Sequence, residues 1–251
     1  MDWNLVVSGS NTGKYNMEFD LDLVSDYNNT SAYLRFYQWE PFCISLGANQ
    51  NIEDINESAA LDQNIETVKR PTGGRAILHA EELTYSVVMP LDKNKFTAKQ
   101  LYEKISLALV EGLKKYSSHL KNVELENQQP HFPSLLKQQS GVLCFASTAK
   151  SEVKFEGKKL IGSAQRKMGD KILQHGSILC GGFHRKLPEF LNVSEEIKPA
   201  LKNEVDEHTT EIEKIIGDKV DYQKLTNCLI EAFQENWGIR FLNSASVKFL
   251  K

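Results

Sequence analysis

The sequence contains little cysteine and no long apolar run. Its 251 residues include only four cysteines, Cys43, Cys144, Cys180 and Cys228, with no CxxC pair and no metal-ligand spacing to the six histidines. Sparse thiols are typical of reducing compartments, so we expect a cytoplasmic protein without a metal site. No segment approaches the roughly 18 consecutive apolar residues that span a bilayer. Residues 1–14 lack the order of a secretion signal, so we expect no membrane contact.

The sequence also lacks an excess of charge of one sign. Its 30 basic and 33 acidic residues give a formal net charge of −3, which excludes an overall field that favours nucleic acid. Hydrophobic residues make up 41% and charged residues 25%, as in ordinary globular proteins, so disorder is not expected. There is no internal repeat and no low-complexity linker, and the length fits one large domain or two small ones.

Apolar periodicity and turn residues predict a mixture of strands and helices. The predicted strands are residues 3–7, 32–39, 43–46, 67–70, 76–78, 83–88, 152–155, 160–165 and 172–179. The predicted helices are residues 16–24, 56–63, 97–117 and 221–237, and residues 119–141 form a long connection. Because regular β-α-β alternation and a GxGxxG fingerprint are both missing, the pattern indicates an α+β or mixed α/β fold and not a Rossmann fold.

The first candidate functional segment is Arg-Pro-Thr-Gly-Gly-Arg-Ala-Ile-Leu-His, residues 70–79. Gly73 and Gly74 lie between predicted strands, where the missing Cβ atoms let the backbone approach a ligand. Exposed N–H groups of such a turn hold an anion or an acyl carbonyl. Arg70 and Arg75 flank the glycines. A tight turn with solvated charges explains the segment equally well.

The second segment is Gly-Lys-Lys-Leu-Ile-Gly-Ser-Ala-Gln-Arg, residues 157–166. Gly162, Ser163 and Ala164 are small and again permit close backbone approach. Lys159 begins an apolar strand, so its amine can point into a pocket, where burial changes its pKa. On this segment alone, a hairpin with a basic tip is the favoured alternative.

Cys144 differs in context from the other three cysteines. It follows a Gln-Gln-Ser-Gly loop, and loops carry functional residues more often than regular elements do. Cys43, Cys180 and Cys228 lie in apolar patterns, which indicates packing. Since free cysteines are more often buried small hydrophobes than nucleophiles, the packing alternative stays open for Cys144 as well.

Taken together, the segments resemble the lipoate–biotin ligase superfamily over nearly the whole chain. The resemblance is carried by residues 8–9, 16–17, 34–39, 41, 45–47, 50, 70–79, 82–86, 157–165, 173–179 and 237–239. It implies an α+β (mixed α/β) catalytic domain of the class II aminoacyl-tRNA synthetase/biotin synthetase type, with mixed sheets flanked by helices. It also implies one domain over residues 1–251, with no accessory C-terminal domain.

Within the superfamily, the sequence is most similar to the LipM-type octanoyltransferases. Cys144 stands 15 residues before Lys159 (159 − 144), about where that group carries its nucleophile. Arg75 occupies a position where ligases tend to carry a third glycine that leaves room for nucleotide phosphates. Residues 146–149 depart from the group by lacking an acidic residue and a proline.

The resemblance implies octanoyl transfer in two steps, a reaction that needs no cofactor. The octanoyl group leaves acyl carrier protein for Cys144, whose thiolate is favoured by the Lys159 ammonium. It then passes to a lysine of a lipoyl domain, such as that of the glycine cleavage H protein. The implied substrate-binding residues are Arg70, Gly73, Gly74, Arg75, Ala76, His79, Gly162, Ser163, Ala164, His175 and Gly176.

Acyl carrier protein is acidic, so a basic surface near the site is expected. The candidates are Lys158, Arg166, Lys167 and Lys171, for each of which a solvated face is an equal alternative. Two other functions stay open. An ATP-dependent lipoate–protein ligase would need ATP and Mg²⁺ and would leave Cys144 incidental, whereas a non-catalytic module would only bind lipoyl groups.

Overall fold

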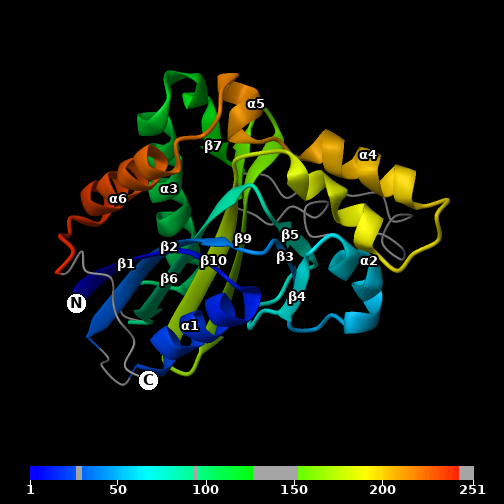
Figure 1. Cartoon of the computed structure of the whole chain (residues 1–251). Helices are drawn as coiled ribbons and strands as arrows, with labels where there is room; N and C mark the ends of the chain where they lie inside the picture. The colour runs from blue at the N-terminus through cyan, green and yellow to red at the C-terminus, as the bar shows by residue number, and fades with distance from the viewer. Residues whose placement is uncertain (27–29, 93–94, 127–151, 243–251) are drawn as a thin grey trace.

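The computed structural model describes residues 1–26, 30–92, 95–126 and 152–242 (Figure 1). Across the seven-stranded sheet the order is β1 (Asp2–Asn11), β2 (Ser31–Trp39), β6 (Glu82–Pro90), β10 (Lys171–Leu179), β9 (Lys158–Met168), β8 (Val153–Phe155) and β7 (Val123–Leu125). The three-stranded sheet has the order β4 (Glu66–Lys69), β3 (Cys43–Leu46) and β5 (Ile77–His79). The pairs β1–β2 and β3–β4 are parallel and the other pairs antiparallel.

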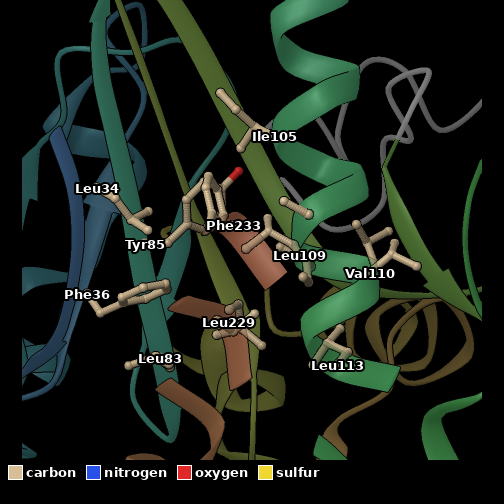
Figure 2. Close-up of a cluster of buried hydrophobic side chains, with 14 of the residues drawn as sticks. Leu34, Phe36, Leu83, Tyr85, Ile105, Leu109, Val110, Leu113, Leu229 and Phe233 are labelled. Atoms are coloured by element: carbon tan, nitrogen blue, oxygen red, sulfur yellow. The ribbon is translucent and has the colours of Figure 1, made fainter. Parts of the chain in front are cut away.

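Helices cover both faces of the larger sheet. On one face, α3 (Ala98–Tyr116) and α6 (Tyr222–Trp237) pack over the main hydrophobic core (Figure 2). On the other face lies α1 (Gly13–Ser25), which joins the two parallel strands at one edge of the sheet. Leu5 packs in the main core and its neighbour Val6 against α1, as the alternation of side chains along a strand requires. The predicted α+β fold with mixed sheets flanked by helices is confirmed.

The smaller sheet has its own hydrophobic cluster. It is built with α2 (Glu57–Asp62), η4 (Phe183–Phe190) and α4 (Lys198–His208). The remaining short elements are η1 (Ile52–Asp54), η2 (Ser118–Leu120) and α5 (Ile212–Ile216). Among the described residues, no helix has both the length and the apolar character needed to cross a bilayer.

Local chemistry explains the best-predicted elements. Helix α3 begins at a capping box, in which the Thr97 hydroxyl accepts from the Gln100 amide and the Gln100 side chain accepts from the Thr97 amide. Its apolar stripe is buried against the sheet, which confirms the predicted helix. Gly157 and Gly169, with φ of 78° and 63°, close the turns on both sides of β9, as predicted.

Several elements were missed. The region after residue 179 contains η4, α4 and α5, none of which was predicted from the sequence. The predicted connection 119–141 begins with η2 and β7, and from residue 127 onwards it lies outside the described residues. Cys43 and Cys180 are fully buried, which confirms their predicted packing role.

His184 in η4 gives the fold a pH-dependent stability. Burial lowers the pKa of His184 to about 4, so the ring is neutral in the folded chain at pH 7. The unfolded chain takes up a proton below about pH 6.5, and stability is therefore lost as the pH falls from 6.5 to 4, by about 3 kcal/mol from this group. Urea unfolding from pH 7 to pH 4 measures the loss. The variant His184→Gln should show a shallower pH dependence than the unaltered chain, and an unchanged slope would contradict the assignment.

Candidate active site

A narrow pocket lies where the two sheets meet. About 300 Å³ of space between its walls is not filled by atoms, and this volume includes open solvent. Strands of both sheets contribute to its walls, together with α1 and the Gly-rich segment. The lining residues are Met17, Tyr37, Trp39, Ser45, Arg70, Ile77, His79, Thr84, Gly162, Ala164, His175, Gly176 and Ser177.

The structure brings together residues that are far apart in the sequence. Six predicted substrate-binding residues line the pocket: Arg70, His79, Gly162, Ala164, His175 and Gly176. The other five, Gly73, Gly74, Arg75, Ala76 and Ser163, are not in its wall. Ala76 is buried in the cluster of the smaller sheet. The Ser163 hydroxyl is hydrogen-bonded to the Tyr85 hydroxyl at 2.7 Å. Substrate contact stays a prediction for all eleven residues.

Arg70 shapes the Gly-rich turn through backbone carbonyls. Its Nη1 donates to the Ser45 carbonyl at 2.8 Å, and its Nη2 donates to the Arg75 carbonyl at 2.7 Å. Nε and Nη2 also donate to the Gly73 carbonyl, at 3.2 and 3.0 Å. The guanidinium therefore ties the turn to strand β3 from a nearly buried position, with 4% of the residue exposed.

The turn also packs against backbone. A Cβ placed on Gly47 would lie 2.0 Å from the Gly74 carbonyl oxygen, so only glycine fits there. Gly176 in β10 is similarly restricted, since its Cβ would lie 2.5 Å from the Gly162 carbonyl oxygen. Close backbone approach, predicted from the small residues, thus occurs between segments of the chain itself.

Arg70→Lys is expected to destabilise the Gly-rich turn. A lysine ammonium is a point charge that lacks the planar fork needed to reach the Ser45, Gly73 and Arg75 carbonyls together. Buried carbonyls left without donors cost about 1–3 kcal/mol. Urea unfolding and the accessibility of the turn to limited proteolysis measure the effect. Lys69→Arg, on an exposed neighbouring position, is the control and should change little.

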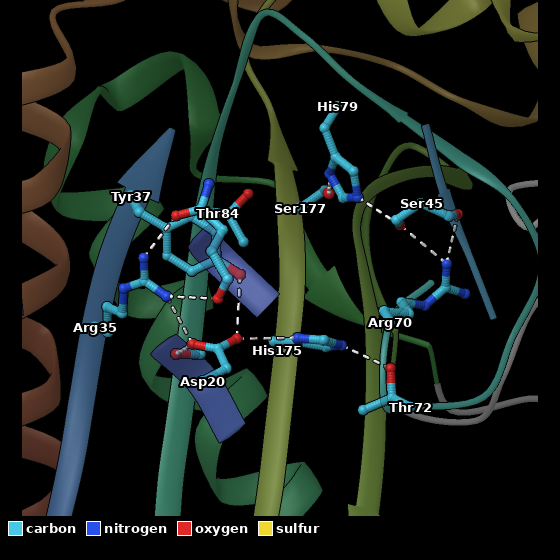
Figure 3. A network of polar contacts seen from close by, with 12 residues as sticks. Asp20, Arg35, Tyr37, Ser45, Arg70, Thr72, His79, Thr84, His175 and Ser177 are labelled. Atoms are coloured by element: carbon cyan, nitrogen blue, oxygen red, sulfur yellow. Dashed lines mark hydrogen bonds and ion pairs between the residues drawn. The ribbon is translucent and has the colours of Figure 1, made fainter. Parts of the chain in front are cut away.

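His175 is held between a carboxylate and a hydroxyl (Figure 3). Its Nδ1 lies 3.3 Å from Asp20 Oδ2, and its Nε2 lies 2.6 Å from Thr72 Oγ1. Burial lowers the pKa of His175, so the ring is neutral. Burial alone would raise the pKa of Asp20, but the hydrogen bond from His175 and the charge of Arg35 outweigh it, and the pKa is lowered. A carboxylate only accepts, so we assign the ring proton to Nδ1, and Nε2 accepts from Thr72.

His79 is held in the same manner. Its Nδ1 lies 2.8 Å from Glu82 Oε1, and its Nε2 lies 2.7 Å from Ser45 Oγ. The same Glu82 oxygen accepts from the hydroxyls of Thr84 at 2.6 Å and Ser177 at 2.9 Å. Both histidines thus present ring carbons to the pocket while their nitrogens are engaged in the wall.

Sequence reasoning missed most of this network. The members not predicted as site residues are Asp20, Arg35, Ser45, Thr72, Glu82, Thr84 and Ser177, and all except Asp20 lie in segments that carry the resemblance. One signal was present, because His175 and Ser177 occupy alternate positions of an apolar strand and so share one face. A polar pair on a buried strand face requires partners, and this requirement predicts a network without naming its other members.

The structure describes only one of the two predicted catalytic residues. Lys159 is 1% exposed, and its Nζ forms an ion pair with Glu152 Oε1 at 2.9 Å. It is not among the lining residues of the pocket. Cys144 lies outside the described residues. Stabilisation of a Cys144 thiolate by Lys159 therefore stays a prediction.

The predicted basic surface needs one correction. Lys171 is 2% exposed and donates to the Asp26 carbonyl, so its assignment to a surface was wrong. Arg166 is exposed and donates to the Pro71 carbonyl at 2.6 Å, which places a positive charge beside the Gly-rich turn. Lys167 is exposed as well, and Lys158 is partly buried, with its amine on the Asp206 carbonyl.

Comparison with known sequences gives a consistent result. Residues 12–234 match the family model described as the lipoyl protein ligase A/B catalytic domain. The octanoyltransferase LipM of Clostridioides difficile is 32% identical over 247 residues, which cover 96% of this chain and 89% of that protein. The octanoyltransferase LipM of Bacillus subtilis is 30% identical, with 94% of this chain and 87% of that protein covered.

Solved structures show the same fold. A bipartite lipoate protein ligase from Thermoplasma acidophilum superposes with a TM-score of 0.75 at 20% identity, covering 96% of this chain and 86% of that chain. A lipoate-protein ligase A bound with ATP gives a TM-score of 0.73 at 19% identity, covering 96% and 87%. At such identities the likeness concerns the fold alone. The described residues contain no group of three or more His, Cys, Asp or Glu side chains placed to hold a metal ion.

Proposed function

The chain belongs to the lipoyl protein ligase A/B catalytic-domain family, and from that membership we propose that it is an octanoyltransferase of protein lipoylation. The proposed reaction moves an octanoyl group from acyl carrier protein to the lysine of a lipoyl domain, such as that of the glycine cleavage H protein. Identity of 30–32% over nearly the full length of LipM octanoyltransferases supports this reaction over ATP-dependent ligation.

The sequence identity carries the proposal, and the pocket supports an apolar substrate. Its wall contains apolar side chains such as Met17 and Ile77. Its histidines and hydroxyls direct their polar atoms to one another, so they present carbon to the interior. An octanoyl chain has no polar atom beyond its carbonyl and suits such a surface.

The proposed chemistry has two steps, a thioester exchange and then the conversion of a thioester to an amide. The Cys144 thiolate attacks the donor carbonyl, the bond from that carbon to the carrier sulfur breaks, and the carrier thiol takes a proton. The neutral lysine amine of the lipoyl domain then attacks the new thioester, and the bond from the carbonyl carbon to the Cys144 sulfur breaks. The nitrogen loses a proton, an amide forms, and the Cys144 thiolate is regenerated. Lys159 is the proposed cation for the thiolate, and backbone N–H groups near Gly162 or Gly74 are the proposed donors to the oxyanion. The proposed reaction uses no nucleotide and no metal ion.

The proposed location is the cytoplasm. Cys43, Cys180 and Cys228 are free thiols in the described part of the chain, which supports a reducing compartment.

Mass spectrometry of the intact enzyme tests the proposal. The protein is incubated with octanoyl acyl carrier protein, digested at low pH and analysed for a mass increase of one octanoyl group on the Cys144 peptide. Addition of a lipoyl domain should then discharge the peptide and load the lysine. Attachment of free lipoate only when ATP is present, with no acylated Cys144 peptide, would overturn the proposal in favour of a ligase.

A further inference from the structure

Every polar side chain in the pocket wall is already paired within the described residues. The ring nitrogens of both histidines are engaged, as are the hydroxyls of Ser45 and Ser177. Among the aromatic residues, Trp39 Nε1 donates to Thr84 Oγ1 at 2.7 Å, and the Tyr37 hydroxyl lies 3.2 Å from Asp20 Oδ2. The wall therefore contains many polar residues but leaves a ligand few groups with which to form hydrogen bonds.

We infer that this pocket excludes acyl chains that carry a hydroxyl group, and that the Trp39–Thr84–Glu82 hydrogen bonds are its specificity determinant. The inference rests on the proposed octanoyl transfer and narrows its substrate class to unsubstituted chains. A hydroxyl that enters such a pocket loses its water without gaining a partner, which disfavours it. In a pocket of this kind, an added hydroxyl lowers the kcat/KM of a substrate by about a hundredfold.

Thr84 is the central residue of these hydrogen bonds. Its hydroxyl accepts from Trp39 and donates to Glu82, so one side chain satisfies two polar groups. Glu82 itself is not in the pocket wall, whereas Thr84 and Ser177, which donate to it, are. In Figure 3, Thr84 lies on the opposite side of His175 from Arg70 and Thr72 of the Gly-rich segment. The inference places the far end of the acyl chain against the wall at Thr84.

Three acyl carrier protein donors test the inference in the unaltered enzyme: octanoyl, nonanoyl and 8-hydroxyoctanoyl. Nonanoyl and 8-hydroxyoctanoyl have the same size and differ by a methyl in place of a hydroxyl. We expect kcat/KM for nonanoyl to exceed that for 8-hydroxyoctanoyl by about a hundredfold, and a ratio below about ten overturns the inference. Failure to transfer octanoyl itself would instead overturn the proposed function.

Thr84→Val tests the assigned residue. Valine keeps the shape and removes the hydroxyl, so the Trp39 N–H on the wall loses its acceptor and becomes available to a substrate hydroxyl. We expect the preference for nonanoyl over 8-hydroxyoctanoyl to fall about tenfold, with little change in the ratio of octanoyl to nonanoyl. Unchanged preference overturns the assignment.

Thr226→Val is the matched control. Thr226 is also buried, but it lies in α6 and donates to the Tyr222 carbonyl away from the pocket, so the preference should stay near a hundredfold. Thermal melting checks that both variants are folded. If Thr84→Val does not fold, Ser177→Ala replaces it, because this change removes another donor to Glu82. Ser177→Ala should also weaken the preference for nonanoyl, and an unchanged preference overturns the assignment.

Discussion

Octanoyl transfer is expected to slow by on the order of 10⁴-fold or more when Cys144 is replaced by serine. The thiolate is the nucleophile in thioester exchange, and an alcohol stays protonated at neutral pH. The variant should also lose the acylated peptide in mass spectrometry. Single-turnover transfer from octanoyl acyl carrier protein to a lipoyl domain measures the loss.

The other cysteines provide the control, because the loss of transfer is expected only for the Cys144 variant. Burial raises the pKa of the Cys43 and Cys180 thiols, which are enclosed in the core and therefore inert. Cys228 lies half-buried in α6, so Cys228→Ser is a mild change remote from the pocket and should retain full transfer. If Cys144→Ser retained transfer within tenfold, the covalent route would be wrong.

Periodicity predicted the elements that contribute most to the core. The helix at residues 97–117 has an apolar stripe and capping residues at its start, and both act locally. Strand β3 was predicted with its observed bounds because a short, largely apolar run is followed by Gly47. In contrast, α4 has no side-chain cap and buries only Leu201 and Val205. Such a short, charged helix forms through tertiary contacts that a local pattern does not contain.

The site was predicted where its chemistry is local in sequence. The segments 70–79 and 157–166 were recognised from small residues and from resemblance, and 173–179 from resemblance, and six of the predicted positions meet in one pocket. The hydrogen-bond network was not predicted, because most of its pairs are distant in sequence. Asp20 and His175 are 155 residues apart, and Thr72 and His175 are 103 apart. Strand order and register bring them together, and neither is visible in the local pattern.

Arg35 is expected to be the most costly polar side chain to remove from the fold. Its guanidinium and the Asp20 carboxylate are both 0% exposed and lie 2.9 Å apart. The remaining donors bind Ser8 Oγ and the Asn16 side chain and carbonyl. The rings of Phe19 and Tyr37 lie against the guanidinium, at 4.1 and 3.9 Å from their centroids. Every part of this side chain therefore has a partner.

Arg35→Met should lower the free energy of unfolding by about 3–5 kcal/mol, because it leaves the Asp20 carboxylate buried without its cation. Urea unfolding at pH 7 measures the loss. Lys14→Met breaks an ion pair with Glu18 in which the two side chains are 80% and 61% exposed, so it should change stability little. Adding Asp20→Asn to Arg35→Met removes the uncompensated charge and should restore part of the stability. If the double variant were as unstable as Arg35→Met, packing of the guanidinium against its two rings, and not its charge, would be the dominant contribution.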